Sequence, residues 1–121
     1  MVSRSLVVKV TAGKDDQERC NQALTVAATA VASGLQVSLW LTGEAAWFAL
    51  PDRAEDVALP HAAPLAQLLG RVLDEGTVTV CSQCASRRDI TADDVIKGVR
   101  IAGASTFLAE IMADGTQALV Y

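Results

Sequence analysis

The chain has 121 residues, of which 51% are hydrophobic and 20% are charged, and its formal net charge is −4. This length and composition predict a single domain, residues 1–121, with a hydrophobic core of its own, and exclude a disordered chain. The negative charge and the scattered basic residues argue against a nucleic-acid partner. Polar residues interrupt the uncharged segment 20–43, so we expect no membrane span there. The N-terminal apolar run is short and soon meets Lys9 and Lys14, so we expect no secretory signal and a cytoplasmic location.

The first half of the chain predicts a strand, a helix, a strand and a short helix, at residues 4–10, 15–34, 35–41 and 44–50. Asp15 and Asp16 stand where a helix N-terminus favours negative charge. Beyond them apolar residues recur every three or four positions, as on one face of a helix, and Gly34 is suited to end it.

The second half predicts a helix at residues 64–75 and a strand at 77–80, and then a further helix that begins at residue 91. A strand at 98–102, a helix at 106–112 and a last strand at 117–121 follow. Thr91, followed by Asp93 and Asp94, resembles a helix cap with an acidic first turn. Ser105 is the expected cap of the helix that follows it.

Short, almost wholly apolar strands that alternate with helices are typical of a parallel sheet covered on both faces. We therefore expect a single three-layer α/β/α domain with an open, mainly parallel five-stranded sheet. In such sheets reactive groups and ligands gather beyond the carboxyl ends of the strands. Three loops are expected to meet there: 11–16, 42–44 and 81–89.

The segment VTVCSQCASRRDI, residues 78–90, lies at that edge and contains the candidate catalytic residues Cys81 and Cys84. Backbone N–H groups of the next turn and the nearby Arg87 and Arg88 would favour the thiolate of Cys81, which is the nucleophilic form. Cys84 either resolves a mixed disulfide on Cys81 or only packs. The two arginines are candidate binding residues for an anion, or belong to a solvated turn.

The other cysteine and the single histidine are weaker candidates. Cys20 falls on the apolar face of the first helix and is expected to be a core thiol. A zinc site built from Cys20, His61, Cys81 and Cys84 is a minor alternative, because one C-x-x-C places only two ligands. We therefore expect no metal, and since no complete glycine-rich phosphate motif is present, we expect no nucleotide or other cofactor.

The aromatic residues Trp40, Trp47 and Phe48 cluster around the end of the second strand. Packing in the core is the favoured interpretation. A subunit contact or the wall of a substrate pocket is the alternative.

The segment around Cys81 resembles the DsrE/DsrF-like family, which includes the TusD-type sulfur relay subunits. In that family an apolar strand ends in Cys, and after five residues come one or two arginines, Gly, and Val or Ile. Here Cys81 is followed by SQCAS, Arg87, Arg88, Asp89 and Ile90. The segment VSLWLTGEAAWFAL and the C-terminal order of elements are also similar, so the resemblance covers the whole chain. Asp89 replaces the usual Gly, and Asp tolerates a positive φ better than most residues.

The resemblance implies an open parallel α/β sheet, homo- or hetero-oligomers and, in some members, a persulfide on the cysteine that corresponds to Cys81. It thus suggests a sulfur-relay or sulfurtransferase-like protein with a sulfur donor and a sulfur acceptor protein as partners. Two alternatives stay open: a thiol–disulfide redox protein that uses Cys81 and Cys84, and a non-catalytic oligomeric binding module.

Overall fold

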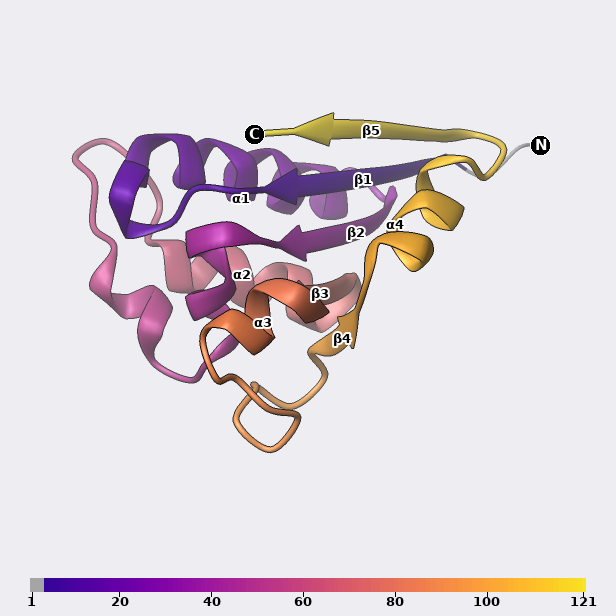
Figure 1. Ribbon diagram of the computed structural model, residues 1–121. Coiled ribbons are helices and arrows are strands. Elements are labelled where there is room, and N and C mark those ends of the chain that lie inside the picture. The colour runs from indigo at the N-terminus through magenta and orange to yellow at the C-terminus, as the bar shows by residue number, and fades with distance from the viewer. Residues whose placement is uncertain (1–3) are drawn as a thin grey trace.

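The computed structural model describes residues 4–121. Within them five strands form one open sheet in the order β4-β3-β2-β1-β5, and all neighbouring strands are parallel (Figure 1). The strands are β1 (Ser5–Val10), β2 (Gln36–Leu41), β3 (Thr77–Cys81), β4 (Arg100–Ala102) and β5 (Thr116–Val120). The predicted α/β fold is confirmed, and the sheet is wholly parallel.

Helices cover the two faces of the sheet unequally. The elements are α1 (Gln17–Ala32), α2 (Leu65–Glu75), α3 (Ser82–Arg87), α4 (Ala104–Ile111) and the 3₁₀ helices η1 (Lys14–Asp16), η2 (Gly43–Ala49) and η3 (Arg53–Asp56). In Figure 1, α1 and α2 lie behind the sheet, and the short α4 lies in front of it. Among residues 4–121 no helix combines the length and the apolar character needed to cross a membrane.

The alternation of side chains along the strands separates an apolar face from a polar one. Val8, Leu39 and Val80 belong to the buried core that the sheet forms with α1 and α2. Their neighbours Lys9 and Trp40, paired across β1 and β2, lie on the opposite face. The face toward α4 therefore carries polar and charged groups between its apolar ones.

The ends of α1 follow from local chemistry. The Asp16 carboxylate accepts a hydrogen bond from the backbone N–H of Arg19 at 3.2 Å, which caps the helix as the acidic pair predicted. Gly34, just beyond the last turn, has φ +85°, a conformation that glycine adopts without steric cost.

The helix expected to begin at Thr91 is absent, and that prediction was wrong. The N–H and hydroxyl of Thr91 do donate to the Asp94 carboxylate, at 2.8 and 2.9 Å, as in a helix cap. The chain then continues in turns, because Val95 and Ile96 pack against the core and the Ile96 N–H donates to the Ala49 carbonyl at 2.8 Å.

Two smaller corrections concern short helices. The segment 81–89 was expected to be a loop, but α3 begins within it, directly after Cys81. The predicted cap Ser105 lies inside α4, because Gly103 occupies the cap position.

Candidate functional site

The loops after β1, β2 and β3 meet at the carboxyl edge of the sheet, as predicted. A Cβ at Gly43 would lie 2.6 Å from the carbonyl oxygen of Thr11, and a Cβ at Gly13 would lie 2.5 Å from that of Glu44. These two loops thus pack backbone against backbone, which only glycine permits at both positions. The Gly43 N–H in turn donates to the Sγ of Cys84 at 3.2 Å and joins the third loop to them.

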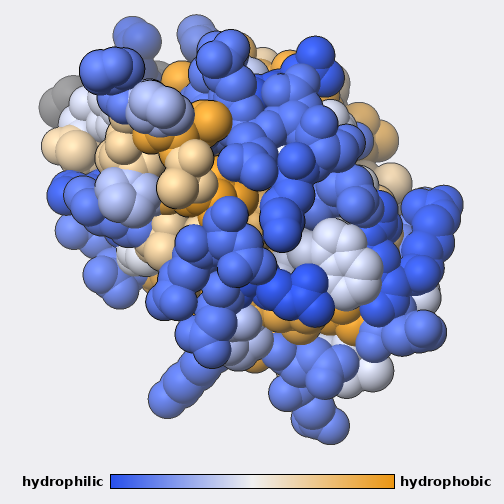
Figure 2. Space-filling model, turned by 90° about the vertical axis from the view of Figure 1, so that its left-hand side faces the viewer, coloured by the Kyte–Doolittle hydropathy of each residue, from blue (hydrophilic) through white to orange (hydrophobic). Residues whose placement is uncertain are grey.

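Figure 2 views the molecule from this edge. The surface is mostly hydrophilic, with a smaller apolar area between charged and polar side chains.

Cys81 is the last residue of β3 and occupies the cap position of α3, where it is partly exposed. Partial burial opposes ionisation of its thiol. The backbone N–H of Cys84, the Cys84 thiol, the backbone N–H of Gln83 and the charge of Lys9 outweigh that effect and lower the pKa of Cys81 below its ordinary value. A half-exposed sulfur with a lowered pKa has the properties of a reactive thiolate.

Cys84 lies one helical turn beyond Cys81, in the first turn of α3, and is a free thiol. Its side chain is among the groups that lower the pKa of Cys81, and its own sulfur accepts from the Gly43 N–H at 3.2 Å. The structure therefore brings the two cysteines together.

Arg88 is engaged with other groups, and Arg87 is exposed. The Arg88 guanidinium donates to the Glu44 carboxylate at 2.7 and 3.2 Å and to the Cys84 carbonyl at 3.1 Å. Neither arginine is among the groups that shift the pKa of Cys81. Arg88 thus ties α3 to the loop after β2, and an anion-binding role for either arginine stays a prediction.

Lys9 is the cation that sequence reasoning missed. It lies in β1 on the face toward α4, and its Nζ is 5.1 Å from the centre of the Phe107 ring. The available signal was a lysine within the otherwise apolar run SLVVKV. A charged residue in the interior of an otherwise apolar strand indicates that another group on the same face of the sheet interacts with its charge.

Cys20 is fully buried in α1, as expected. Burial above all, with the charges of Asp15 and Asp16, raises its pKa to about 12, so it is inert as a nucleophile. His61 is exposed. Residues 4–121 contain no group of three or more histidine, cysteine, aspartate or glutamate side chains placed to hold a metal ion.

Asp89, which replaces the usual glycine after the arginines, has φ 55°. The turn does have the left-handed conformation that a glycine would favour. The Ile90 N–H donates to the Ala85 carbonyl at 2.9 Å across this turn and ends α3.

Packing in the core accounts for two of the three clustered aromatic residues. Trp40 and Phe48 are 2% and 1% exposed. Trp47 is only partly buried, and the guanidinium of Arg53 lies 4.9 Å from the centre of its ring.

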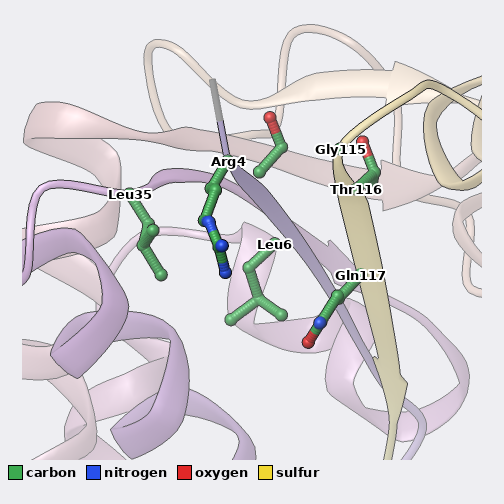
Figure 3. A pocket seen from close by; sticks show the side chains of 7 residues that line it. Arg4, Leu6, Leu35, Gly115, Thr116 and Gln117 are labelled. Atoms are coloured by element: carbon green, nitrogen blue, oxygen red, sulfur yellow. The ribbon is translucent and has the colours of Figure 1, made fainter. Parts of the chain in front are cut away.

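A hollow of about 420 Å³ lies at the opposite, amino edge of the sheet, between β1, β5 and the residue before β2. In Figure 3 the Arg4 side chain extends between Leu35 and Leu6. The hollow contains no cysteine, so we assign it no part in the chemistry of Cys81.

The sequence model of the DsrE/DsrF-like family matches residues 4–121. The chain belongs to the DsrE/DsrF-like family. None of the curated proteins compared with it matches.

Solved structures similar to this DsrE/DsrF-like chain support the fold. The YchN protein from E. coli has a TM-score of 0.77 at 20% identity, over 99% of this chain and 100% of that chain. Protein MTH1491 from Methanobacterium thermoautotrophicum, of unknown function, has a TM-score of 0.72 at 12% identity, over 98% and 100%. Protein BT1422 from Bacteroides thetaiotaomicron has a TM-score of 0.58 at 16% identity, over 97% and 94%. At these identities the likeness concerns the fold alone.

Proposed function

We propose that the chain is a sulfur-relay protein that carries a persulfide on Cys81. The observation that carries the proposal is the position of this sulfur, partly exposed at the carboxyl edge of the sheet and at the cap position of α3, where the backbone N–H groups of the first turn lower its pKa. Membership of the DsrE/DsrF-like family supports it.

The chemistry needs no cofactor. The Cys81 thiolate attacks the outer sulfur of a donor persulfide, R–S–SH, and a new S–S bond forms while the donor S–S bond breaks. The donor leaves as a thiolate, R–S⁻, and Cys81 carries the outer sulfur as Cys81–S–SH. A thiolate of an acceptor protein then attacks that outer sulfur, and Cys81 leaves as a thiolate again. The backbone N–H groups that lower the pKa of Cys81 favour the anionic sulfur at both stages.

Mass spectrometry of the intact protein after incubation with glutathione persulfide tests this function. We expect the mass of one added sulfur atom, located on the peptide that contains Cys81 and removed by a thiol reductant. Cys81→Ser should abolish loading, whereas the matched variant Cys20→Ser should load like the wild type, because Cys20 is buried. Absence of sulfur on Cys81, or equal loading of Cys81→Ser, would reject the proposal.

A thiol–disulfide role is the second candidate, and it is favoured by the place of Cys84 one helical turn beyond Cys81, where its side chain lowers the pKa of Cys81. In this reaction an oxidant such as a disulfide, R–S–S–R, is attacked by Cys81 to give a mixed disulfide and one thiol. Cys84 then displaces the second thiol and closes the Cys81–Cys84 disulfide. Mild oxidation should make both thiols resistant to alkylation until a reductant is added. Full alkylation of both after oxidation would exclude this role.

We also propose that the chain forms a homo-oligomer. The third functional alternative, a non-catalytic oligomeric binding module, requires such an assembly too. Leu108 in α4, Met112 just after α4, and Leu119 and Val120 in the edge strand β5 are 57, 72, 40 and 65% exposed. A second copy would supply a surface of the same apolar kind, and β5 carries no charge that would oppose pairing. Light scattering should give a multiple of 12.7 kDa, and the double variant Leu108→Asp with Met112→Asp should lower that mass. A monomer in the wild type would refute self-association.

A further inference from the structure

Lys9 and Cys81 share one face of the sheet. The register pairs Lys9 with Trp40 and Trp40 with Thr79, so these three side chains form a row across β1, β2 and β3. Cys81 is two residues beyond Thr79 in the same strand and points to the same side. Two strand spacings, roughly 10 Å, separate the backbones of β1 and β3, and Cys81 lies about 7 Å further along β3 than Thr79, so the Lys9 side chain covers part of the distance and acts on the sulfur through space.

The ammonium of Lys9 is held over this face instead of extending into solvent. Its Nζ lies 5.1 Å from the centre of the Phe107 ring, which projects from α4. Phe107 in turn packs edge-on against Trp40, with 5.3 Å between ring centres. No carboxylate lies within ion-pair distance of Lys9 among residues 4–121. Its positive charge is thus free to act on another anion.

The charged groups of β4 and α4 on the same face neutralise each other. The Glu110 carboxylate accepts from the Ser38 hydroxyl at 2.6 Å, from the Trp40 indole at 3.0 Å and from Arg100 at 2.5 Å. Arg100 also donates to the Thr79 hydroxyl at 2.9 Å. Both charges of this pair are engaged.

The charged groups of the other neighbouring elements point elsewhere. Arg88 of the α3 region is paired with Glu44. Arg87 is exposed, borders a hollow with Ser82, Gln83 and Ser86, and is not among the groups that lower the pKa of Cys81. Tyr121, after β5, packs against the core on the other face. Lys9 is therefore the cation placed to act on the sulfur of Cys81.

We propose that Lys9 is a positioning residue for the sulfur chemistry, one that holds the thiolate of Cys81, and the persulfide formed on it, in the anionic state. The part that concerns the persulfide rests on the proposed function. The part that concerns the thiolate does not. The charge of Lys9 has the direction this role requires, since it lowers the pKa of Cys81.

The pH profile of Cys81 alkylation by iodoacetamide, followed on the Cys81 peptide by mass spectrometry, tests the inference. Lys9→Met should move the profile to higher pH and slow alkylation at neutral pH by about two- to fivefold, the factor expected for one charge interaction of a partly exposed pair. Lys9→Arg keeps the charge and should stay within about twofold of the wild type. A merely structural role would not predict rescue by the conservative variant.

Lys97→Met is the matched control, because it removes an exposed lysine and the same unit of charge. An unchanged profile in Lys9→Met, or an equal shift in Lys97→Met, would overturn the inference. Loading from glutathione persulfide at neutral pH is measured separately. Slower loading of Lys9→Met supports both proposals, whereas a shifted alkylation profile without loading of any variant keeps the role of Lys9 and rejects the persulfide function.

Discussion

Replacement of Gly43 by alanine tests whether the loops at the carboxyl edge depend on close backbone packing. Gly43 has φ +54°, and a Cβ there would lie 2.6 Å from the Thr11 carbonyl oxygen. Gly34 has φ +85° with nothing within 4 Å of a Cβ. The two positions thus share the left-handed backbone and differ in the contact.

The expected costs follow from this difference. Left-handed backbone costs alanine about 1–2 kcal/mol, which is the whole effect expected for Gly34→Ala. At Gly43 the Cβ is nearly 1 Å closer to a backbone atom than ordinary contact allows, and forced packing of this kind costs roughly 1–3 kcal/mol more. Gly43→Ala should therefore lower the free energy of unfolding by about 2–5 kcal/mol.

Urea unfolding of the wild type and the two variants, followed by circular dichroism, measures these free energies. The loops of Thr11 and Gly43 must also move apart in Gly43→Ala, which changes the geometry of the hydrogen bond from the Gly43 N–H to the Cys84 sulfur. If Gly43→Ala costs no more than Gly34→Ala, the close approach of the two backbones does not exist in solution, and the geometry derived for the site fails with it.

Three further predictions concern other parts of the molecule. Burial raises the pKa of Glu110, but hydrogen bonds from Ser38, Trp40 and Arg100 outweigh burial and lower this pKa. Ionised Glu110 therefore stabilises the fold at pH values above its unfolded-state pKa near 4.5. This contribution is lost as the pH falls through the lower pKa of the folded state. Glu110→Gln should therefore be less stable than the wild type at neutral pH, with a smaller difference in acid, and an equal difference at both pH values would contradict this. Cys20 should resist iodoacetamide at pH 8 and react in 6 M guanidinium, since it is buried; alkylation of the folded protein at Cys20 would show that α1 opens readily. Gly70→Ala, inside α2 with open space around a Cβ, should raise the free energy of unfolding by about 0.5–1 kcal/mol, and a loss of stability would contradict the helix at this position.

Local patterns in the sequence were sufficient for the order of most elements and for the parallel sheet. A strand needs only a short β-branched apolar run, and α1 needs only apolar periodicity, an acidic cap and a glycine at its end, all of which are read from adjacent residues. The end of β3 at the cysteine and the meeting of the three loops follow from the same information, because the carboxyl ends of parallel strands lie at one edge.

The missing helix after Thr91 shows where local information fails. The cap itself is present, with both hydrogen bonds to Asp94. Burial of Val95 and Ile96 against the core competes with continuation of the helix, and burial is a property of the folded chain, not of the segment.

The charges around Cys81 were decided by the tertiary structure alone. From the sequence, Arg87 and Arg88 were the nearest cations, but Arg87 is exposed and Arg88 pairs with Glu44, 44 residues earlier in the chain. Lys9, far away in sequence, reaches the same face of the sheet through strand register and the ring of Phe107. The sequence by itself determined the order of most elements. Electrostatic energy depends on distance in space and not on separation along the chain, so the charged groups that act on the Cys81 sulfur were decided only by the assembled sheet.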